Sequence, residues 1–208
     1  TTAQISKIGS AQISALSATQ ISAIESQDVA SLTTDQISTL TATQVRALSS
    51  SQLVAMTTAQ ISKIGTQQIA ALNAAQLSAL QTEDLAQLTQ AQVQSISASA
   101  LQAMTTAQVS SLSAAKLAML TTSQIRSLTA DQIKAVNASN LSDMSSAQFA
   151  ALTATQAAVL TTAQISNLST SQLAGIANTS VAAMTTAQLA AINSTKVEKM
   201  TAGQIRSM

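Results

Sequence analysis

The chain has 208 residues, a net charge of +1 and 46% apolar residues, which is enough to bury a core. It contains no Cys, His, Pro, Trp or Tyr, and Phe149 is its one aromatic residue. This composition excludes disulfides, a thiol nucleophile, a histidine base and the commonest transition-metal ligands. The sequence also carries no basic stripe for nucleic acid and no apolar run long enough to span a membrane.

Every predicted element is one eight-residue repeat. From the N-terminus the rows read TTAQISKI, GSAQISAL, SATQISAI, ESQDVASL, TTDQISTL, TATQVRAL and SSSQLVAM, and TTAQISKI then returns at residue 57. The chain divides into 26 such octads without an insertion or a deletion, and we number them from 1 (residues 1–8) to 26 (residues 201–208). Position 8 is always Ile, Leu, Val or Met, position 5 is large and apolar in all octads but one, and position 4 is Gln in 19 octads.

A second pattern with a longer period divides this single repeat array into blocks. Met ends the octads at residues 56, 104, 144 and 184, and TTAQ or SSAQ follows each of them. We therefore predict blocks at 1–56, 57–104, 105–144, 145–184 and 185–208, and we expect the chain to be an excerpt of a longer array. The first two blocks share their first nine residues and an acidic fourth octad, which indicates a duplication. Alternatively, the duplication left a pattern that has no structural meaning.

Each octad has the signature of one short capped helix. Position 1 is Thr, Ser or Asn in 21 octads, which are preferred N-cap residues, and the Gln three residues later completes a capping box. Six of the eight acidic residues lie at positions 1 to 4, and seven of the nine basic residues lie at positions 6 or 7, as the helix dipole favours. One continuous helix is excluded, because eight residues at roughly 100° each would rotate the apolar pair by about 80° per octad.

Such short helices are not stable alone in water, so they must stack with positions 5 and 8 facing inward. The sequence therefore predicts an all-α fold, a narrow solenoid of 26 short capped helices with one helix per octad. The alternative is a β-solenoid, because Thr, Ile and Val are plentiful. The sorted charges and the low number of glycines, four in the chain, favour the helical interpretation.

Octads such as LTTDQISTL, MTTAQLAAI and LTTAQISNL, each written here with the preceding residue, resemble a known repeat. They are similar to the LTTAQ-type octapeptide repeats of large bacterial secreted and cell-surface proteins, which are often described as adhesin-like. The resemblance covers all 26 octads and implies an extracellular or bacterial cell-surface setting. Some of these proteins are also labelled haem-utilisation-like, but this chain has no His, Cys or Tyr to ligate iron, and its Met residues occupy core positions.

The sequence predicts no catalytic, cofactor-binding or metal-binding residue and no cofactor. Paired carboxylates occur at Glu25 and Asp28 and at Glu83 and Asp84, which is compatible with weak cation binding. Either pair offers fewer oxygen ligands than Ca²⁺ prefers, so we expect these acids to complement the dipole in the first turn of a helix.

These features predict a non-enzymatic structural module that acts as an extracellular spacer, stalk or filament subunit. The alternative function is a binding surface, in which ladders of Ser, Thr and Gln side chains contact a glycan, another polymer or ice. The expected partners are further copies of the chain or neighbouring repeats of a longer chain. We expect no nucleic acid and no membrane span.

Overall fold

Short helices fill the chain from end to end. The computed structural model describes residues 2–5 and 7–208, and the chain divides into two compact units, Thr1–Met104 and Thr105–Met208. The described residues form 25 α-helices and one 3₁₀ helix, η1, and they contain no β-strand. The prediction of an all-α repeat with one helix per octad is therefore confirmed, and the β-solenoid is wrong.

The first unit contains thirteen α-helices, one in each octad. They are α1 (Thr2–Ile5), α2 (Ser10–Ala15), α3 (Ala18–Ser22), α4 (Ser26–Val29), α5 (Thr34–Thr39), α6 (Ala42–Ala47), α7 (Ser50–Ala55), α8 (Thr58–Ser62), α9 (Thr66–Ala71), α10 (Ala74–Ala79), α11 (Thr82–Gln87), α12 (Gln90–Ser95) and α13 (Ala98–Gln102).

The second unit contains the remaining twelve α-helices and η1. They are α14 (Thr106–Ser111), α15 (Ala114–Met119), α16 (Thr122–Ser127), α17 (Ala130–Ala135), η1 (Ala138–Leu141), α18 (Ser146–Ala150), α19 (Ala154–Ala158), α20 (Thr162–Asn167), α21 (Thr170–Gly175), α22 (Asn178–Val181), α23 (Thr186–Ala190), α24 (Ser194–Val197) and α25 (Ala202–Ser207).

Octad positions 1 and 8 set the limits of each helix. In α5 the Thr33 hydroxyl accepts a hydrogen bond from the Gln36 backbone N–H (3.2 Å), and the Gln36 Oε1 accepts one from the Thr33 N–H (2.6 Å). The helix ends at Leu40, whose φ of −57° and ψ of 137° turn the backbone out of the helix. Reciprocal caps of this kind recur where Thr, Ser or Asn precedes Gln by three residues, as the capping-box pattern predicts.

One octad departs from the predicted α-helix. In NASNLSDM, the Asn137 side chain accepts from the N–H of Ser139, two residues on, and the segment closes as the 3₁₀ helix η1. Position 4 of this octad is Asn140, which is one methylene shorter than the usual Gln. A local side-chain bond of this type competes with the capping box, which explains the tighter helix.

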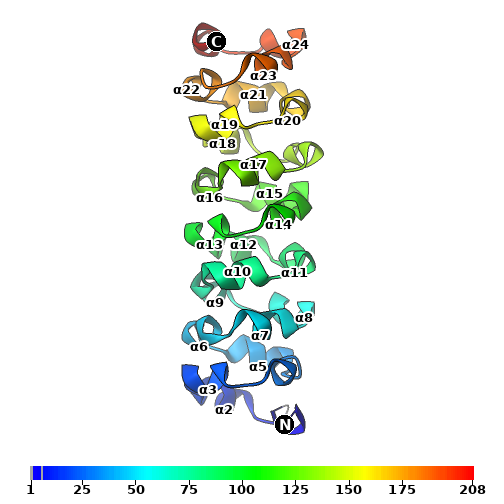
Figure 1. The fold of residues 1–208 in the computed structure, drawn as a ribbon, viewed down its shortest axis with the longest axis vertical. Helices are drawn as coiled ribbons and strands as arrows, with labels where there is room; N and C mark the ends of the chain where they lie inside the picture. Colours follow the sequence, from blue (N-terminus) through cyan, green and yellow to red (C-terminus); the bar gives the residue numbers. More distant parts are fainter. Residues whose placement is uncertain (1, 6) are drawn as a thin grey trace. The chain divides into compact units, whose positions relative to one another are not determined.

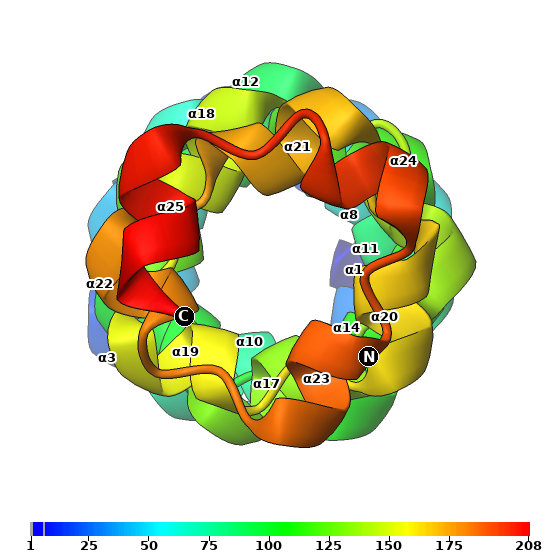
Figure 2. The ribbon, with the colours of Figure 1, turned by 90° about the horizontal axis from the view of Figure 1, so that it is seen from above.

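Within each unit the octads wind around a common interior, and each helix packs against the helix three octads away. In the first unit α2 contacts α5, α3 contacts α6 and α6 contacts α9. In the second unit α22, α23, α24 and α25 follow one another around the ring, and α25 returns to lie against α22 (Figures 1 and 2). We call one such circuit a coil.

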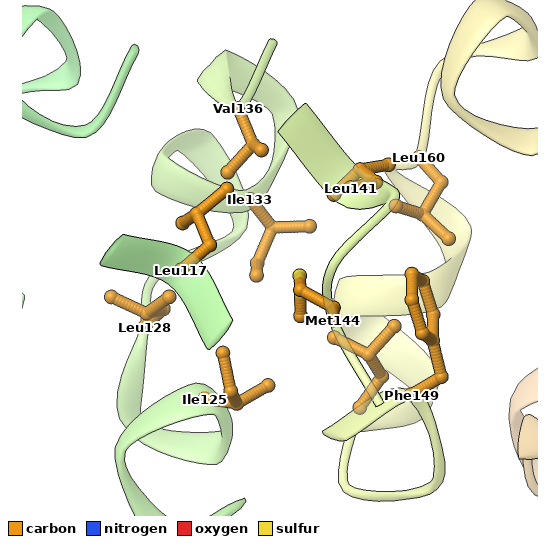
Figure 3. A pocket seen from close by; sticks show the side chains of 10 residues that line it. Leu117, Ile125, Leu128, Ile133, Val136, Leu141, Met144, Phe149 and Leu160 are labelled. Atoms are coloured by element: carbon orange, nitrogen blue, oxygen red, sulfur yellow. The ribbon is translucent and has the colours of Figure 1, made fainter. Parts of the chain in front are cut away.

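Positions 5 and 8 supply the core of both units, as predicted, and nearly all of these side chains are buried. In the second unit, Met144 and Phe149 face Leu128 and Ile133 across the interior (Figure 3). The cavity between them and their neighbours has a volume of only about 10 Å³ and an apolar lining. Side chains therefore fill the space that the ribbons enclose at this level. None of the described helices has the length and apolarity that a membrane span requires.

Candidate functional site: a ladder of buried glutamines

The Gln at position 4 makes a second set of contacts besides its capping box. In α6 the Oε1 of Gln44 accepts from the N–H of Thr41 (2.7 Å), which closes the start of its own helix. Its Nε2 points to the neighbouring coil and donates to the carbonyl oxygens of Ile13 (2.9 Å) and Leu16 (2.7 Å). These two carbonyls belong to positions 5 and 8 of the octad four repeats earlier. Gln44 is 2% exposed, so both contacts lie out of water.

The same geometry repeats along both units. The Nε2 donates to the position-8 carbonyl oxygen four octads earlier, at 2.5–2.8 Å, in Gln36, Gln44, Gln52, Gln60, Gln76, Gln92, Gln148, Gln156, Gln164, Gln172, Gln188 and Gln204. Gln68 donates in the same way to the Leu40 carbonyl. We call this set of side chains and carbonyls the glutamine ladder.

The glutamine ladder satisfies both ends of the short helices at once. The last carbonyls of a helix have no partner inside it, and a helix of six residues has few internal bonds to offset that loss. The Oε1 accepts from an N–H that precedes one helix, and the Nε2 donates to carbonyls that end a helix in the preceding coil. Because unpaired buried polar groups cost about 1–3 kcal/mol each, these bonds make the stacking of coils specific as well as favourable.

Where position 4 is not Gln, other side chains can preserve a donor to the octad four repeats earlier. The Asn140 Nδ2 donates to the Leu112 carbonyl (2.8 Å), the Ser180 Oγ donates to that of Leu152 (2.9 Å), and the Lys196 Nζ donates to that of Ser166 (2.5 Å). Ala100, which is buried, has no polar side chain to offer. The contact is therefore retained with shorter or longer side chains, and Ala100 interrupts it.

The predicted carboxylate pairs do not converge into cation sites. Asp28 and Asp84 occupy position 4 and are buried, whereas Glu25 and Glu83 are exposed. Asp28, Glu83 and Asp84 lie in the first turns of α4 and α11, as expected for acids that complement the dipole. Among the described residues, no three Asp or Glu side chains are grouped closely enough to hold a metal ion.

Octad 11 shows how an acid is accommodated in the glutamine ladder. The Asp84 carboxylate accepts from the Gln81 N–H (3.3 Å), which retains the capping half of the role of Gln. An ionised carboxylate has no hydrogen to donate to the earlier coil. Instead, the Gln81 side chain at position 1 donates through Nε2 to the carbonyl of Val54 (3.3 Å). The donor has thus moved from position 4 to position 1.

Lys116 is the position-4 residue of octad 15 and is partly buried. Burial lowers the pKa of its ammonium group below the ordinary value, because the charged form loses hydration.

Sequence reasoning identified the capping box but missed the bond to the neighbouring coil, although one signal was present. Glu serves a capping box as well as Gln does. Nevertheless, none of the 26 octads has Glu at position 4. A requirement for a donating amide explains this preference, because a Glu carboxylate would face carbonyl oxygens.

The position of the Gln side chains also corrects the predicted surface ladder of Ser, Thr and Gln. The Gln residues of the glutamine ladder are 6% exposed or less, so they offer no amide to an external ligand. The position-1 hydroxyl groups remain near the surface, where many of them accept the N–H that closes a helix. The surface therefore retains hydroxyl groups but few of the predicted amides.

Comparison with known proteins supports the repeat assignment. The profile of the ALTTAQ repeat is similar to this chain over residues 21–58 and 50–82. No curated protein sequence matches the chain.

Proposed function

We propose that the chain is a non-enzymatic spacer in an extracellular protein of the bacterial cell surface. The observation that carries this proposal is the glutamine ladder, because the same bond recurs at thirteen position-4 Gln residues of the two units. A further octad with Gln at position 4, added in phase, finds the same kinds of donors, acceptors and apolar neighbours. The length of the array can therefore change without a change in the local structure. The cell-surface setting rests on the resemblance to LTTAQ-type repeats.

The alternative function, a binding surface of hydroxyl and amide groups, receives less support. The amides that were expected to serve it are buried in the glutamine ladder, where they donate to backbone carbonyls. A spacer needs no distinctive octad, and the regular pattern of the chain suits it.

The test asks whether the function depends on the length of the array or on the identity of particular octads. Deleting residues 105–144 removes five octads and joins Met104 to Ser145, which keeps both the repeat phase and a natural Met–Ser–Ser–Ala–Gln junction. We expect the activity of the protein that carries the array to fall. We expect a second copy of residues 145–184, which are also five octads, to restore it when placed in the gap. Circular dichroism of each variant checks that the helical content per residue is unchanged.

Restoration by residues 105–144 alone, and not by 145–184, would contradict the spacer role and would locate a binding surface in the deleted block. An unchanged activity in the deletion variant would also contradict it, because a spacer acts through its length.

A further inference from the structure

The glutamine ladder of the first unit is regular up to octad 10 and irregular in octads 11 to 13. From octad 5 to octad 10, every octad donates from position 4 to the octad four repeats earlier. The donors are Gln36, Gln44, Gln52, Gln60, Gln68 and Gln76. In the next three octads only Gln92 makes this bond, to the Ile64 carbonyl (2.6 Å), because Asp84 and Ala100 replace Gln in the octads on either side.

The two replacements leave two buried carbonyls without a partner. Met56 precedes Asp84 by 28 residues and Leu72 precedes Ala100 by 28 residues, which is the spacing of the ladder bonds to position 8. Both residues are buried, and neither carbonyl accepts a hydrogen bond from a described residue. A carbonyl that leaves water without gaining a donor destabilises the packed state.

Asp84 adds a buried charge at the same place. Its side chain is 2% exposed, accepts one hydrogen bond of 3.3 Å from the Gln81 N–H and makes no ion pair with a described residue. The Gln81 side chain donates to the Val54 carbonyl and leaves that of Met56 unpaired. A carboxylate that is buried without a countercharge loses hydration, and it regains that hydration when the coils separate.

Apolar packing still joins the irregular octads to the preceding coil. The helix α11 packs against α8, α12 against α9 and α13 against α10, and Leu85, Leu88 and Leu101 are buried. These octads are therefore closed in the folded chain but are held to the preceding coil by fewer hydrogen bonds than octads 8 to 10. We call octads 11 to 13, residues 81–104, the weak segment.

The second unit contains no comparable stretch among octads 18 to 26. In each of these octads the position-4 side chain donates to the octad four repeats earlier. The donors are Asn140, Gln148, Gln156, Gln164, Gln172, Ser180, Gln188, Lys196 and Gln204. Replacement of Gln is therefore compatible with a donated bond, and the weak segment differs because Asp84 and Ala100 offer no donor.

We propose that the weak segment is a conformational device that opens before octads 5 to 10 and lets the spacer lengthen under tension. In a solenoid each octad contacts only its neighbours, so stability is a sum of local terms and the least stable stack opens first. The 24 residues of the weak segment span at most about 80 Å when fully extended. The proposal rests on the spacer role proposed above and adds an extensible element to it.

The first experiment measures native-state hydrogen exchange of the full 208-residue chain by mass spectrometry. Residues 57–80, which are octads 8 to 10, are the internal reference, because they have the same length as the weak segment and carry Gln at every position 4. The two missing donors should make the backbone amides of residues 81–104 exchange faster than those of residues 57–80, on the order of 10-fold.

Asp84→Asn supplies a donor without a change in side-chain size. Asn140 shows that an amide of this length at position 4 reaches the position-8 carbonyl four octads earlier (2.8 Å). The variant should slow the exchange of residues 81–104 on the order of 10-fold and leave that of residues 57–80 unchanged. Glu83→Gln is the matched control, because it removes the same charge at an exposed position of the same octad, and it should change the exchange by less than about twofold.

The second experiment applies tension to the two ends of the full chain in optical tweezers. The native chain and the Glu83→Gln chain should first extend at the same force. The Asp84→Asn chain should first extend at a higher force, because the new bond to the Met56 carbonyl must break and the buried charge no longer favours opening.

Three results would overturn the proposal. They are exchange in residues 81–104 that is as slow as in residues 57–80, an effect of Asp84→Asn on exchange no larger than that of Glu83→Gln, and an unchanged force of first extension in Asp84→Asn. None of these results bears on the spacer role, because the exchange of residues 105–144 for 145–184 changes length outside the weak segment. Conversely, a failed exchange of blocks with slowed hydrogen exchange in Asp84→Asn would leave the weak segment in place and remove the spacer role.

Discussion

At the scale of single residues, position 4 carries the most specific chemistry in the repeat. The Gln side chain combines an acceptor for the N-cap N–H with a donor for the earlier coil. An ionised Glu of the same length can only accept, and an apolar side chain can do neither. Asn140 and Ser180 retain one donated bond each, and Asp84 relies on the neighbouring Gln81 for a donor. The preference for Gln therefore follows from two separate hydrogen-bonding requirements at one position.

Replacing a Gln of the glutamine ladder should be more destabilising than replacing an end Gln that only caps. Gln52→Ala removes the donor to the carbonyls of Ile21 (3.0 Å) and Ile24 (2.6 Å). The Ile21 carbonyl keeps the Ile24 N–H as a partner, whereas the Ile24 carbonyl loses its side-chain donor, and we expect a loss of about 2 kcal/mol. Gln20→Ala removes only a capping contact and should cost about 0.5 kcal/mol. Urea unfolding of both variants gives the comparison. Equal losses at Gln52 and Gln20 would contradict a contribution from the hydrogen bonds between coils.

Adding the missing Gln should stabilise the chain. Ala100 lies 31 and 28 residues after Ile69 and Leu72, whose carbonyls are the acceptors that a Gln at position 4 would reach. We expect Ala100→Gln to raise the free energy of unfolding by about 1 kcal/mol, measured by urea unfolding. Ser99→Gln, at the exposed neighbouring position, is the control and should change it by less than about 0.5 kcal/mol. If Ala100→Gln instead lowers the free energy of unfolding, the space between the coils at Ala100 is too small for a Gln side chain.

At the scale of the elements, the residue at position 4 does not by itself set the length of the helix. The helices α4, α22 and α24 have only four residues and η1 is 3₁₀, and all four belong to octads without Gln at that position. However, α11 and α15 also lack the Gln and have six residues each. Close helix approach sets a second constraint, because position 7 lies against position 2 of the octad three repeats earlier. The Thr39 hydroxyl, for example, lies 3.4 Å from the Ser10 carbonyl oxygen. Small residues at position 7 therefore allow the helices to pack closely.

Gly175 gives the clearest test of this packing between α18 and α21. A Cβ at Gly175 would lie 2.6 Å from the Ser146 carbonyl oxygen, so Gly175→Ala must displace backbone. We expect a loss of about 1–3 kcal/mol in urea unfolding despite the better helix propensity of Ala. The control is Gly203→Ala in α25, whose Cβ meets only the exposed side chain of Asn178, which can move aside. A stabilising Gly175→Ala would contradict the close approach.

The sequence was sufficient to predict the elements and the core, because both depend on local chemistry. Thr33 at an N-cap, Gln36 three residues later and Ile37 and Leu40 at helical spacing predict a short capped helix with one buried face, and the structure confirms it. The bond from Gln44 to Leu16 could not be predicted, because it depends on how many octads complete a coil. That number results from the angle between successive helices, which no single octad determines.

At the scale of each unit, two sets of contacts bound the number of octads in one coil. In the first unit α4 packs on α1 and α8 packs on α5, in each case across three octads. Gln60 of octad 8 donates to the carbonyls of octad 4, at Val29 and Leu32, across four octads. One coil therefore takes between three and four octads. The blocks at 1–56, 57–104, 105–144, 145–184 and 185–208 stay a prediction.

The most direct test of the winding compares two distances in the first unit by pulsed electron paramagnetic resonance. The chain has no Cys, so spin labels can be placed at chosen pairs of introduced cysteines. Thr43, Ala59 and Gln67 are exposed at position 3 of octads 6, 8 and 9, and α6 packs against α9. The labels of Thr43→Cys with Gln67→Cys should therefore lie closer together than those of Thr43→Cys with Ala59→Cys, although they are farther apart in sequence. A distance that simply increases with sequence separation would contradict a coil of three to four octads.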